Sequence, residues 1–260
     1  MRTTHKNYML QTLQKIFETN TVQINDGGET IPLHSNTSLQ QGLFIQEMFD
    51  LAKPNQSVEV GFAYGISSLF ILEKHKQLKS KTAAHIVIEP DNYWGGGAEY
   101  NIEKEGLSEY VQIKRDFSDK VLAGLFLDNT RIQFAYIDST KQFDVIMQDF
   151  YLINKIMDVG GIIVLDDCGG NWPGVQRVAR FVNTLPHYEK VGAHDKNKTS
   201  FKKALAQKVI SLIIGLIPFK KRVYEGIDFS TNKQLGLDYS CIAFKKIGED
   251  KRAWNWDRAI

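Results

Sequence analysis

The sequence predicts an α/β protein built on a doubly wound, mostly parallel sheet. From residue 57 onward, short apolar runs alternate with amphipathic segments of helical period. Polar residues follow directly after several of the apolar runs, and a glycine-containing turn joins the first run to the first helix. Strands that alternate with helices give a parallel sheet covered on both faces, and ligands bind beyond the carboxyl ends of its strands.

The apolar runs and the helical periodicity define each element of this sheet in turn. Residues 57–61 form the first predicted strand, and residues 66–80 form the helix that follows it. The later strands are predicted over residues 84–89, 110–114, 132–138, 161–165 and 239–245, and the later helices over residues 98–105, 143–157 and 175–183.

Two helices are predicted before the first strand. Apolar residues recur at helical spacing from Met9 to Phe17, which is typical of a packing helix. Residues 38–52 form an amphipathic helix, for which either Thr37 or Ser38 can serve as the N-cap.

The overall composition narrows the class of protein. The formal net charge of +2 argues against a general nucleic-acid-binding role, since such domains carry a clear basic excess. Cys168 and Cys241 lie far apart, which indicates reduced thiols in a cytoplasmic protein. Residues 1–20 contain no uninterrupted apolar stretch, so a cleaved signal peptide is not expected.

The turn over residues 59–68 is the strongest functional signal. Gly61 and Gly65 allow a tight turn and a close approach of backbone to a ligand. Ala63 stands where a dinucleotide fingerprint has its middle glycine, and residue 66 is not a glycine, so a pyrophosphate ligand is disfavoured. S-adenosylmethionine has no phosphate, and the acidic Glu59 suits its ammonium group, directly or through water. A plain strand-to-helix turn is the alternative interpretation.

Glu89 ends the second predicted strand, where a carboxylate can accept hydrogen bonds from both hydroxyls of a ribose. The same arrangement occurs in NAD-binding proteins, so Glu89 indicates a nucleoside without deciding which one. A surface glutamate at a strand end is the alternative.

Five segments in the right order resemble the class I methyltransferases of bacterial secondary metabolism, a group that includes the macrocin-type sugar O-methyltransferases. The segments are residues 58–68, Ile88-Glu89-Pro90 with Trp94-Gly95-Gly96, Tyr136-Ile137-Asp138, residues 160–167 and residues 172–178.

The resemblance implies a Rossmann-like methyltransferase fold with seven strands and an S-adenosylmethionine cofactor. Phe117 would frame the adenine together with Asp116, although core packing is the commoner role of such an aromatic. The cofactor-binding residues implied are Glu59, Gly61, Ala63, Gly65, Ser67, Ser68, Glu89, Asp116, Phe117 and Asp138.

Asp138, Asp166 and Asp167 supply carboxylates at two strand ends that are expected to be adjacent. Mg²⁺ prefers oxygen ligands of this kind, and in the sugar-methylating relatives equivalent acids hold a metal that chelates the hydroxyls of the acceptor. The three residues are therefore candidate metal ligands. Capping of the next turn and helix is the alternative role for paired aspartates.

This chain departs from its relatives at the position of the proton acceptor for a hydroxyl substrate. The relatives continue the fourth strand as Asp-Gly-Asp-His, whereas this chain reads Asp138-Ser139-Thr140-Lys141. Asp138 and Lys141 are the candidate catalytic residues, and Lys141 could act as a base only if burial lowered its pKa. His187 and His194 are alternative bases that no motif supports.

Residues 199–222 form a predicted helical insertion that is both basic and apolar. Eight of the 32 Lys and Arg residues lie within residues 196–222, which contain no Asp or Glu. The apolar stretch is shorter than the roughly 20 residues that span a bilayer. A helix packed across the substrate cleft, a peripheral membrane contact and a homodimer contact remain open.

We therefore expect an S-adenosylmethionine-dependent methyltransferase that acts on oxygen of a small molecule or glycan, in the cytoplasm or at the inner membrane surface. The alternatives are an NAD-type oxidoreductase and a catalytically silent S-adenosylmethionine-binding protein. We expect one domain over residues 1–260, in which an N-terminal helical cap (1–56), a cofactor-binding core (57–193), a helical insertion (194–237) and a final strand with its tail (238–260) follow one another.

Overall fold

The computed structural model describes residues 9–34, 36–91, 95–196 and 230–258, and its centre is a sheet of seven strands. In chain order the strands are β3 (Ser57–Val60), β4 (His85–Ile88), β5 (Val111–Lys114), β6 (Ile132–Ile137), β7 (Met157–Leu165), β8 (Tyr188–Lys196) and β9 (Tyr239–Lys246). Their order across the sheet is β5-β4-β3-β6-β7-β9-β8. The strands from β5 to β7 run parallel, whereas β9 is antiparallel to both β7 and β8. The predicted doubly wound, mostly parallel sheet is confirmed.

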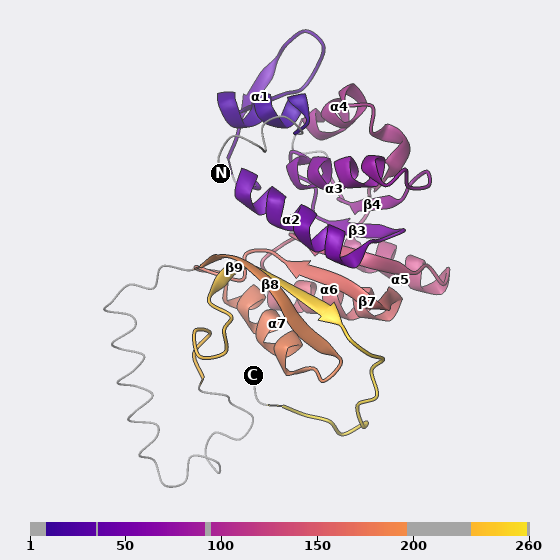
Figure 1. Cartoon of the computed structure of the whole chain (residues 1–260), viewed down its shortest axis with the longest axis vertical. Helices are drawn as coiled ribbons and strands as arrows, with labels where there is room; N and C mark the ends of the chain where they lie inside the picture. Colours follow the sequence, from indigo (N-terminus) through magenta and orange to yellow (C-terminus); the bar gives the residue numbers. More distant parts are fainter. Residues whose placement is uncertain (1–8, 35, 92–94, 197–229, 259–260) are drawn as a thin grey trace, which may run out of the picture.

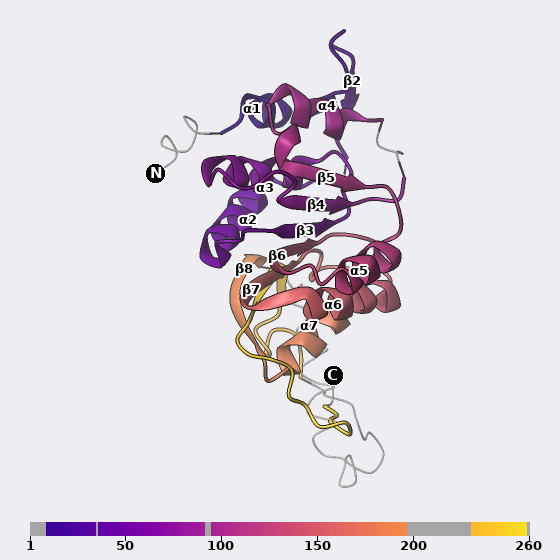
Figure 2. The same ribbon diagram turned by 90° about the vertical axis from the view of Figure 1, so that its right-hand side faces the viewer.

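Helices cover both faces of this sheet (Figures 1 and 2). One face carries α2 (Leu39–Ala52) and α3 (Ile66–Gln77), and the other carries α5 (Ser118–Leu127), α6 (Phe143–Ile156) and α7 (Pro173–Thr184). Strand β6 shows why both faces must be covered, because successive side chains of a strand point to opposite faces. Phe134 and Tyr136 pack in the core under α2, while Ala135 and Ile137 pack in the core under α6.

The N-terminal part combines helices with a small hairpin. Helix α1 (Gln11–Thr19) confirms the predicted packing helix, since Leu13 and Ile16 are buried. Ser38 is the N-cap of α2, because its side chain accepts a hydrogen bond from the Gln41 amide at 3.2 Å. Beside α4 (Gly97–Lys104) lies a hairpin that the sequence did not predict, formed by β1 (Thr21–Gln23) and β2 (Thr30–Pro32). The short η1 (Ser108–Tyr110) contacts α4 as well.

Two further elements were not predicted. In α5 only Leu122 is buried, so the helix shows no clear apolar stripe. Strand β8 is mostly polar and forms through seven Cα pairings with β9, about 50 residues later in the sequence. It runs to Lys196, so the sheet extends beyond residue 193, where the insertion was expected to begin.

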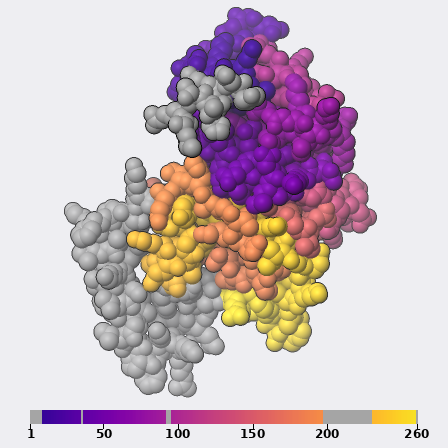
Figure 3. Space-filling model, in the orientation of Figure 1, coloured from indigo at the N-terminus to yellow at the C-terminus, as the bar shows by residue number. Residues whose placement is uncertain are grey.

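The carboxyl-terminal strands and tail form the lower part of the face seen in the space-filling view (Figure 3). The predicted insertion over residues 199–222 lies outside the described residues. Among the helices of the described ranges, none is long and apolar enough to cross a membrane.

His75, near the end of α3, is fully buried and gives a prediction for stability. Burial, and secondarily the neighbouring His85, lower its pKa from 6.5 to about 3. Below pH 6.5 the unfolded chain therefore binds a proton that the folded chain excludes. We expect this residue to make the free energy of unfolding fall from pH 6.5 toward pH 3 by up to about 1.4 kcal/mol per pH unit.

Urea denaturation between pH 7.5 and pH 5 checks this expectation. The slope with pH should become shallower in His75→Gln and stay unchanged in His34→Gln, which alters an exposed histidine. An unchanged slope in His75→Gln would show that His75 is protonated in the folded protein.

Candidate active site

The carboxyl ends of three neighbouring strands meet at the point where the strand order reverses. Strand β3 lies between β4 and β6 and leads through a turn into α3. The Gly61 amide donates a hydrogen bond to the Ile88 carbonyl at 3.0 Å, and the Asp138 amide donates to the Val60 carbonyl at 2.9 Å. Ligands of doubly wound sheets bind at this position.

A cavity of about 440 Å³ opens at these strand ends, within the size range of small-molecule sites. Five of the predicted cofactor residues line it, namely Gly61, Ala63, Glu89, Phe117 and Asp138. The other lining residues were not predicted as cofactor contacts, and they are Val60, Phe62, Ile88, Pro90, Ser118, Ser139, Thr140, Gln142 and Val145. Their common signal is sequence position, because each lies at or shortly after a strand that ends at this edge.

A smaller adjoining cavity of about 40 Å³ is also lined by Gly61, Ala63 and Asp138. Ser67 from the first turn of α3 contributes to it, as predicted for a cofactor contact. So does Thr37, which precedes α2 and had no motif to mark it. Whether Thr37 reaches this cavity depends on how the N-terminal segment folds over the turn, which no local motif specifies.

The backbone of the turn explains its glycines. Gly61 has φ +95°, and a Cβ atom at this position would lie 2.1 Å from the Asp138 carbonyl oxygen. Gly65 also has positive φ, at +70°. Ala63 adopts φ 44°, a left-handed conformation that costs a residue with a Cβ about 1 kcal/mol. In this conformation Ala63 lies in the wall of the cavity, together with the backbone of the turn.

Glu59 is placed differently from the expectation that it meets the ammonium group of the ligand. Its carboxylate is fully buried, accepts hydrogen bonds from the Ser67 and Ser68 hydroxyls, and lies 3.0 Å from Nε2 of His85. Glu59 lines neither cavity. The carboxylate thus lies in a supporting position under the first turn of α3, and its contact with the ammonium group, directly or through water, stays a prediction.

Three predicted cofactor residues, Gly65, Ser68 and Asp116, do not line the cavities, whereas Phe117 next to Asp116 does. Gly65 and Ser68 lie in the turn and helix but line neither cavity. Asp116 does not line the larger cavity either. Its Oδ1 accepts hydrogen bonds from the Phe117 amide at 2.8 Å and from Lys120 Nζ at 3.1 Å. Phe117 is 61% exposed and lines the cavity, so the alternative of core packing is wrong for this residue.

Glu89 is held at the cavity wall by the turn. Its Oε2 accepts a hydrogen bond from the Phe62 amide at 3.1 Å, which ties the end of β4 to the turn after β3. The carboxylate also lines the larger cavity. Among the described residues that line it, Glu89 and Asp138 are the only ones with an ionisable acidic or basic side chain, and both are acidic. The cavity therefore favours a cationic ligand over a phosphate-bearing one.

The three acidic residues predicted to hold a metal do not form a common site. Lys141 Nζ lies 2.6 Å from Asp138 Oδ1 and 2.8 Å from Asp167 Oδ2, so an ammonium occupies the space between these two carboxylates. Asp166 Oδ2 instead accepts hydrogen bonds from Gln41 Nε2 at 2.6 Å and from the Tyr136 hydroxyl at 2.8 Å.

Among the described residues, no group of three or more His, Cys, Asp or Glu side chains is arranged to hold a metal ion. The arrangement of Asp138, Asp166 and Asp167 thus does not fit a magnesium ion, and the expected ligand set is corrected on this point. The physical reason is that Lys141 already supplies the positive charge.

The electrostatics of this group also bear on the proton acceptor. Burial by itself lowers the pKa of Lys141, but the charges and hydrogen bonds of Asp138 and Asp167 outweigh it and raise that pKa. Lys141 is therefore an ammonium and cannot serve as the base. Burial and the charge of Asp166 raise the pKa of Asp138 to about 8, against the opposing effect of Lys141.

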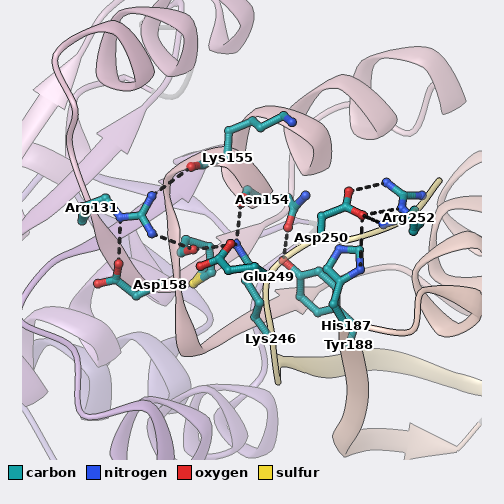
Figure 4. Close-up of polar contacts among 11 residues, drawn as sticks. Arg131, Asn154, Lys155, Asp158, His187, Tyr188, Lys246, Glu249, Asp250 and Arg252 are labelled. Carbon is teal, nitrogen blue, oxygen red and sulfur yellow. Dashed lines mark hydrogen bonds and ion pairs between the residues drawn. The ribbon is translucent and has the colours of Figure 1, made fainter. Parts of the chain in front are cut away.

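The two alternative bases lie elsewhere. His187 belongs to a separate polar cluster of the C-terminal tail, where its Nδ1 is 3.8 Å from Asp250 Oδ1 (Figure 4). His194 stacks on Phe44 with ring centroids 5.8 Å apart. Neither histidine lines the cavities at the strand ends.

Comparisons with known proteins agree with this geometry. Residues 58–168 match a family model described as a methyltransferase domain. The fold is similar to an O-methyltransferase from Bacillus cereus in complex with SAH, with a TM-score of 0.55 and 19% identity over 70% of this chain and 83% of that one. It is also similar to the O-methyltransferase TomG from Streptomyces achromogenes, which is involved in tomaymycin synthesis and was solved with SAM. That TM-score is 0.60 at 13% identity, over 92% of this chain and 91% of that one. No curated protein matches the chain.

Proposed function

We propose that this chain is an S-adenosylmethionine-dependent methyltransferase that methylates an oxygen of a small molecule or glycan. The match of residues 58–168 to a methyltransferase domain model supports this proposal. The observation that carries this proposal is the cavity at the strand ends, where the acidic Glu89 and Asp138 are the only ionisable side chains among the described lining residues. An acidic cavity suits a sulfonium cofactor with an ammonium group. It disfavours the pyrophosphate of NAD, and neither the oxidoreductase nor the silent binding protein is supported by the comparisons.

The cavity wall suggests how the cofactor lies. Glu89, anchored by the Phe62 amide, would accept hydrogen bonds from the ribose hydroxyls, while the ring of Phe117 would form a wall for the adenine. Gly61 and Ala63 would bring backbone close to the methionine part of the cofactor. Asp138 lines both cavities and so faces the region where methionine part and acceptor would meet.

Methyl transfer to a hydroxyl forms a carbon–oxygen bond, breaks the carbon–sulfur bond of the sulfonium and releases one proton. The protein contributes mainly by aligning the two reacting atoms and by excluding water. We propose that Asp138 accepts the proton, because its carboxylate is 33% exposed and lines the cavities. Lys141 would balance the charge of Asp138 and Asp167, and no step passes through a metal ion.

The acceptor class rests on the resemblance to the macrocin-type enzymes, which suggests a sugar hydroxyl. Incubation with labelled S-adenosylmethionine and a panel of sugars, glycans and phenols tests this proposal. We expect label in an acceptor that carries free hydroxyls, and less than about one hundredth of that rate in Asp138→Asn. Failure of the wild-type protein to bind S-adenosylhomocysteine in calorimetry would refute the function as a whole.

Glu89→Gln is expected to raise the Kd for S-adenosylhomocysteine by about tenfold, since an amide is a weaker acceptor than a carboxylate for the ribose hydroxyls. Isothermal titration calorimetry measures this change. Glu103→Gln, which alters an exposed glutamate of α4, should leave the Kd unchanged. Equal affinities of the wild-type protein and Glu89→Gln would remove Glu89 from the cofactor site.

A further inference from the structure

A chain of buried polar side chains runs from the end of α3 to the turn after β3. Ser80 Oγ lies 2.8 Å from His75 Nδ1, and His75 Nε2 lies 2.7 Å from Ser57 Oγ. Ser57 Oγ lies 2.9 Å from His85 Nδ1, and His85 Nε2 lies 3.0 Å from Glu59 Oε2. The side chains of Ser57, Glu59, His75 and His85 are all fully buried.

The hydrogen-bonding capacity of each side chain indicates which atom donates and which accepts in this series of hydrogen bonds. Both oxygens of Glu59 accept hydrogen bonds from serine hydroxyls, and we assign its contact with His85 as a further accepted bond, which places a proton on Nε2 of His85. Nδ1 of His85 is then an acceptor and receives the Ser57 hydroxyl proton. The Ser57 oxygen in turn accepts from His75 Nε2–H, which leaves His75 Nδ1 to accept from Ser80. With these roles every ring nitrogen of the two histidines has a hydrogen-bond partner.

The other end of the chain reaches the first turn of α3. Glu59 accepts hydrogen bonds from the Ser67 and Ser68 hydroxyls, and Ser67 lines the smaller cavity. Gly65, the N-cap of α3, provides no side-chain hydrogen bond to the helix. The position of this first turn therefore depends on the orientation of Glu59, and that orientation depends on the donor from His85.

We propose that His85 is a positioning residue for the cofactor site, which acts through Glu59 on Ser67 and Ser68, and that Ser57, His75 and Ser80 fix the tautomer that lets it donate. This inference rests on the proposed function for its ligand. It assigns the two buried histidines a role beyond core packing, and it connects the cofactor turn to a serine at the opposite end of α3.

The first test reads the tautomers directly. Nitrogen NMR of the imidazole rings in the wild-type protein should show Nε2–H and bare Nδ1 for both His75 and His85. In Ser80→Ala the donor to His75 Nδ1 is lost, and the tautomer populations should become mixed. The matched control Ser108→Ala, at an exposed serine, should leave the spectrum unchanged. An Nδ1–H tautomer at His85 in the wild-type protein would overturn the proposal.

The second test measures the Kd for S-adenosylhomocysteine. His85→Leu removes the donor to Glu59 and should raise the Kd by about tenfold, as expected for the loss of one hydrogen bond to a charged group. His85→Gln can still accept from Ser57 and donate to Glu59, and it should stay within about threefold of the wild-type Kd. It also provides a folded variant if His85→Leu does not fold.

The outcomes distinguish a failure of the proposed function from a failure of the positioning role of His85. A wild-type protein that binds no S-adenosylhomocysteine refutes the proposed function, while the tautomer measurement can still be made without ligand. Normal wild-type binding together with an unchanged Kd in folded His85→Leu refutes the positioning role alone. A tenfold loss in His85→Gln as well would show that packing of the ring matters and the donor does not, which also overturns the proposal.

Discussion

Gly61→Ala is expected to abolish cofactor binding and to lower the free energy of unfolding by more than about 3 kcal/mol. The new Cβ would lie 2.1 Å from the Asp138 carbonyl oxygen and 2.8 Å from its carbonyl carbon. Neither atom belongs to a flexible side chain, and the Asp138 amide is itself hydrogen-bonded to Val60. The φ of +95° adds strain that any residue with a Cβ would experience. The contact between the ends of β3 and β6 would have to open.

Calorimetry with S-adenosylhomocysteine and urea denaturation measure the two effects of Gly61→Ala. Gly124→Ala is the matched control, because this glycine lies within α5 and an added Cβ would meet nothing within 4 Å. We expect the control to bind normally and to gain up to about 1 kcal/mol of stability from helix propensity. A Gly61→Ala protein that folds and binds like the wild type would mean that the two strand ends do not touch as described.

Lys141→Met is expected to lower the rate of methyl transfer by about two orders of magnitude while changing the Kd for S-adenosylhomocysteine much less. The substitution keeps the length of the side chain but removes the ammonium that lies between Asp138 and Asp167. These two carboxylates then repel each other, and Asp138 loses the partner that favours its ionised form. A protonated Asp138 cannot accept a proton from the acceptor hydroxyl.

Chelation of divalent cations provides the companion measurement for Lys141. With Lys141 in place, EDTA should leave the rate of methyl transfer unchanged, because the carboxylates are already matched by an internal cation. Lys155→Met, at an exposed lysine of α6, is the control and should retain the wild-type rate. Loss of wild-type activity in EDTA, with recovery in magnesium, would show that a metal displaces Lys141 during catalysis.

The parts of the fold that could be predicted are those whose signal is local. Strand β6 is a buried apolar run, and its end at Asp138 is marked by the change to polar residues. The glycines of the turn after β3 are equally local, since the backbone conformation required there limits the choice of residue. Gly61, Ala63, Glu89 and Asp138, which these signals mark, line one cavity in the structure, and Phe117, which the family resemblance implies, lines it too.

The parts that could not be predicted depend on partners distant in the chain. Strand β8 is a strand because β9 pairs with it, and its own sequence is largely polar. The position of Glu59 could not be predicted for a similar reason. An acidic residue before a glycine turn reads the same whether it faces a ligand or lies under a helix, and only the packing of His85 from β4 decided between the two.

The sequence by itself determined the doubly wound sheet and the edge at which the candidate cofactor residues gather, because periodicity and turn chemistry operate over a few residues. The class of cofactor came from the family resemblance of its motifs. The tertiary structure alone decided how the charges in that site are matched. Asp138 and Asp167 are 29 positions apart, and whether a metal or Lys141 lies between them depends on how β6 and β7 align in the sheet. Electrostatic energies depend on distances between atoms in space, and separation along the chain does not specify those distances.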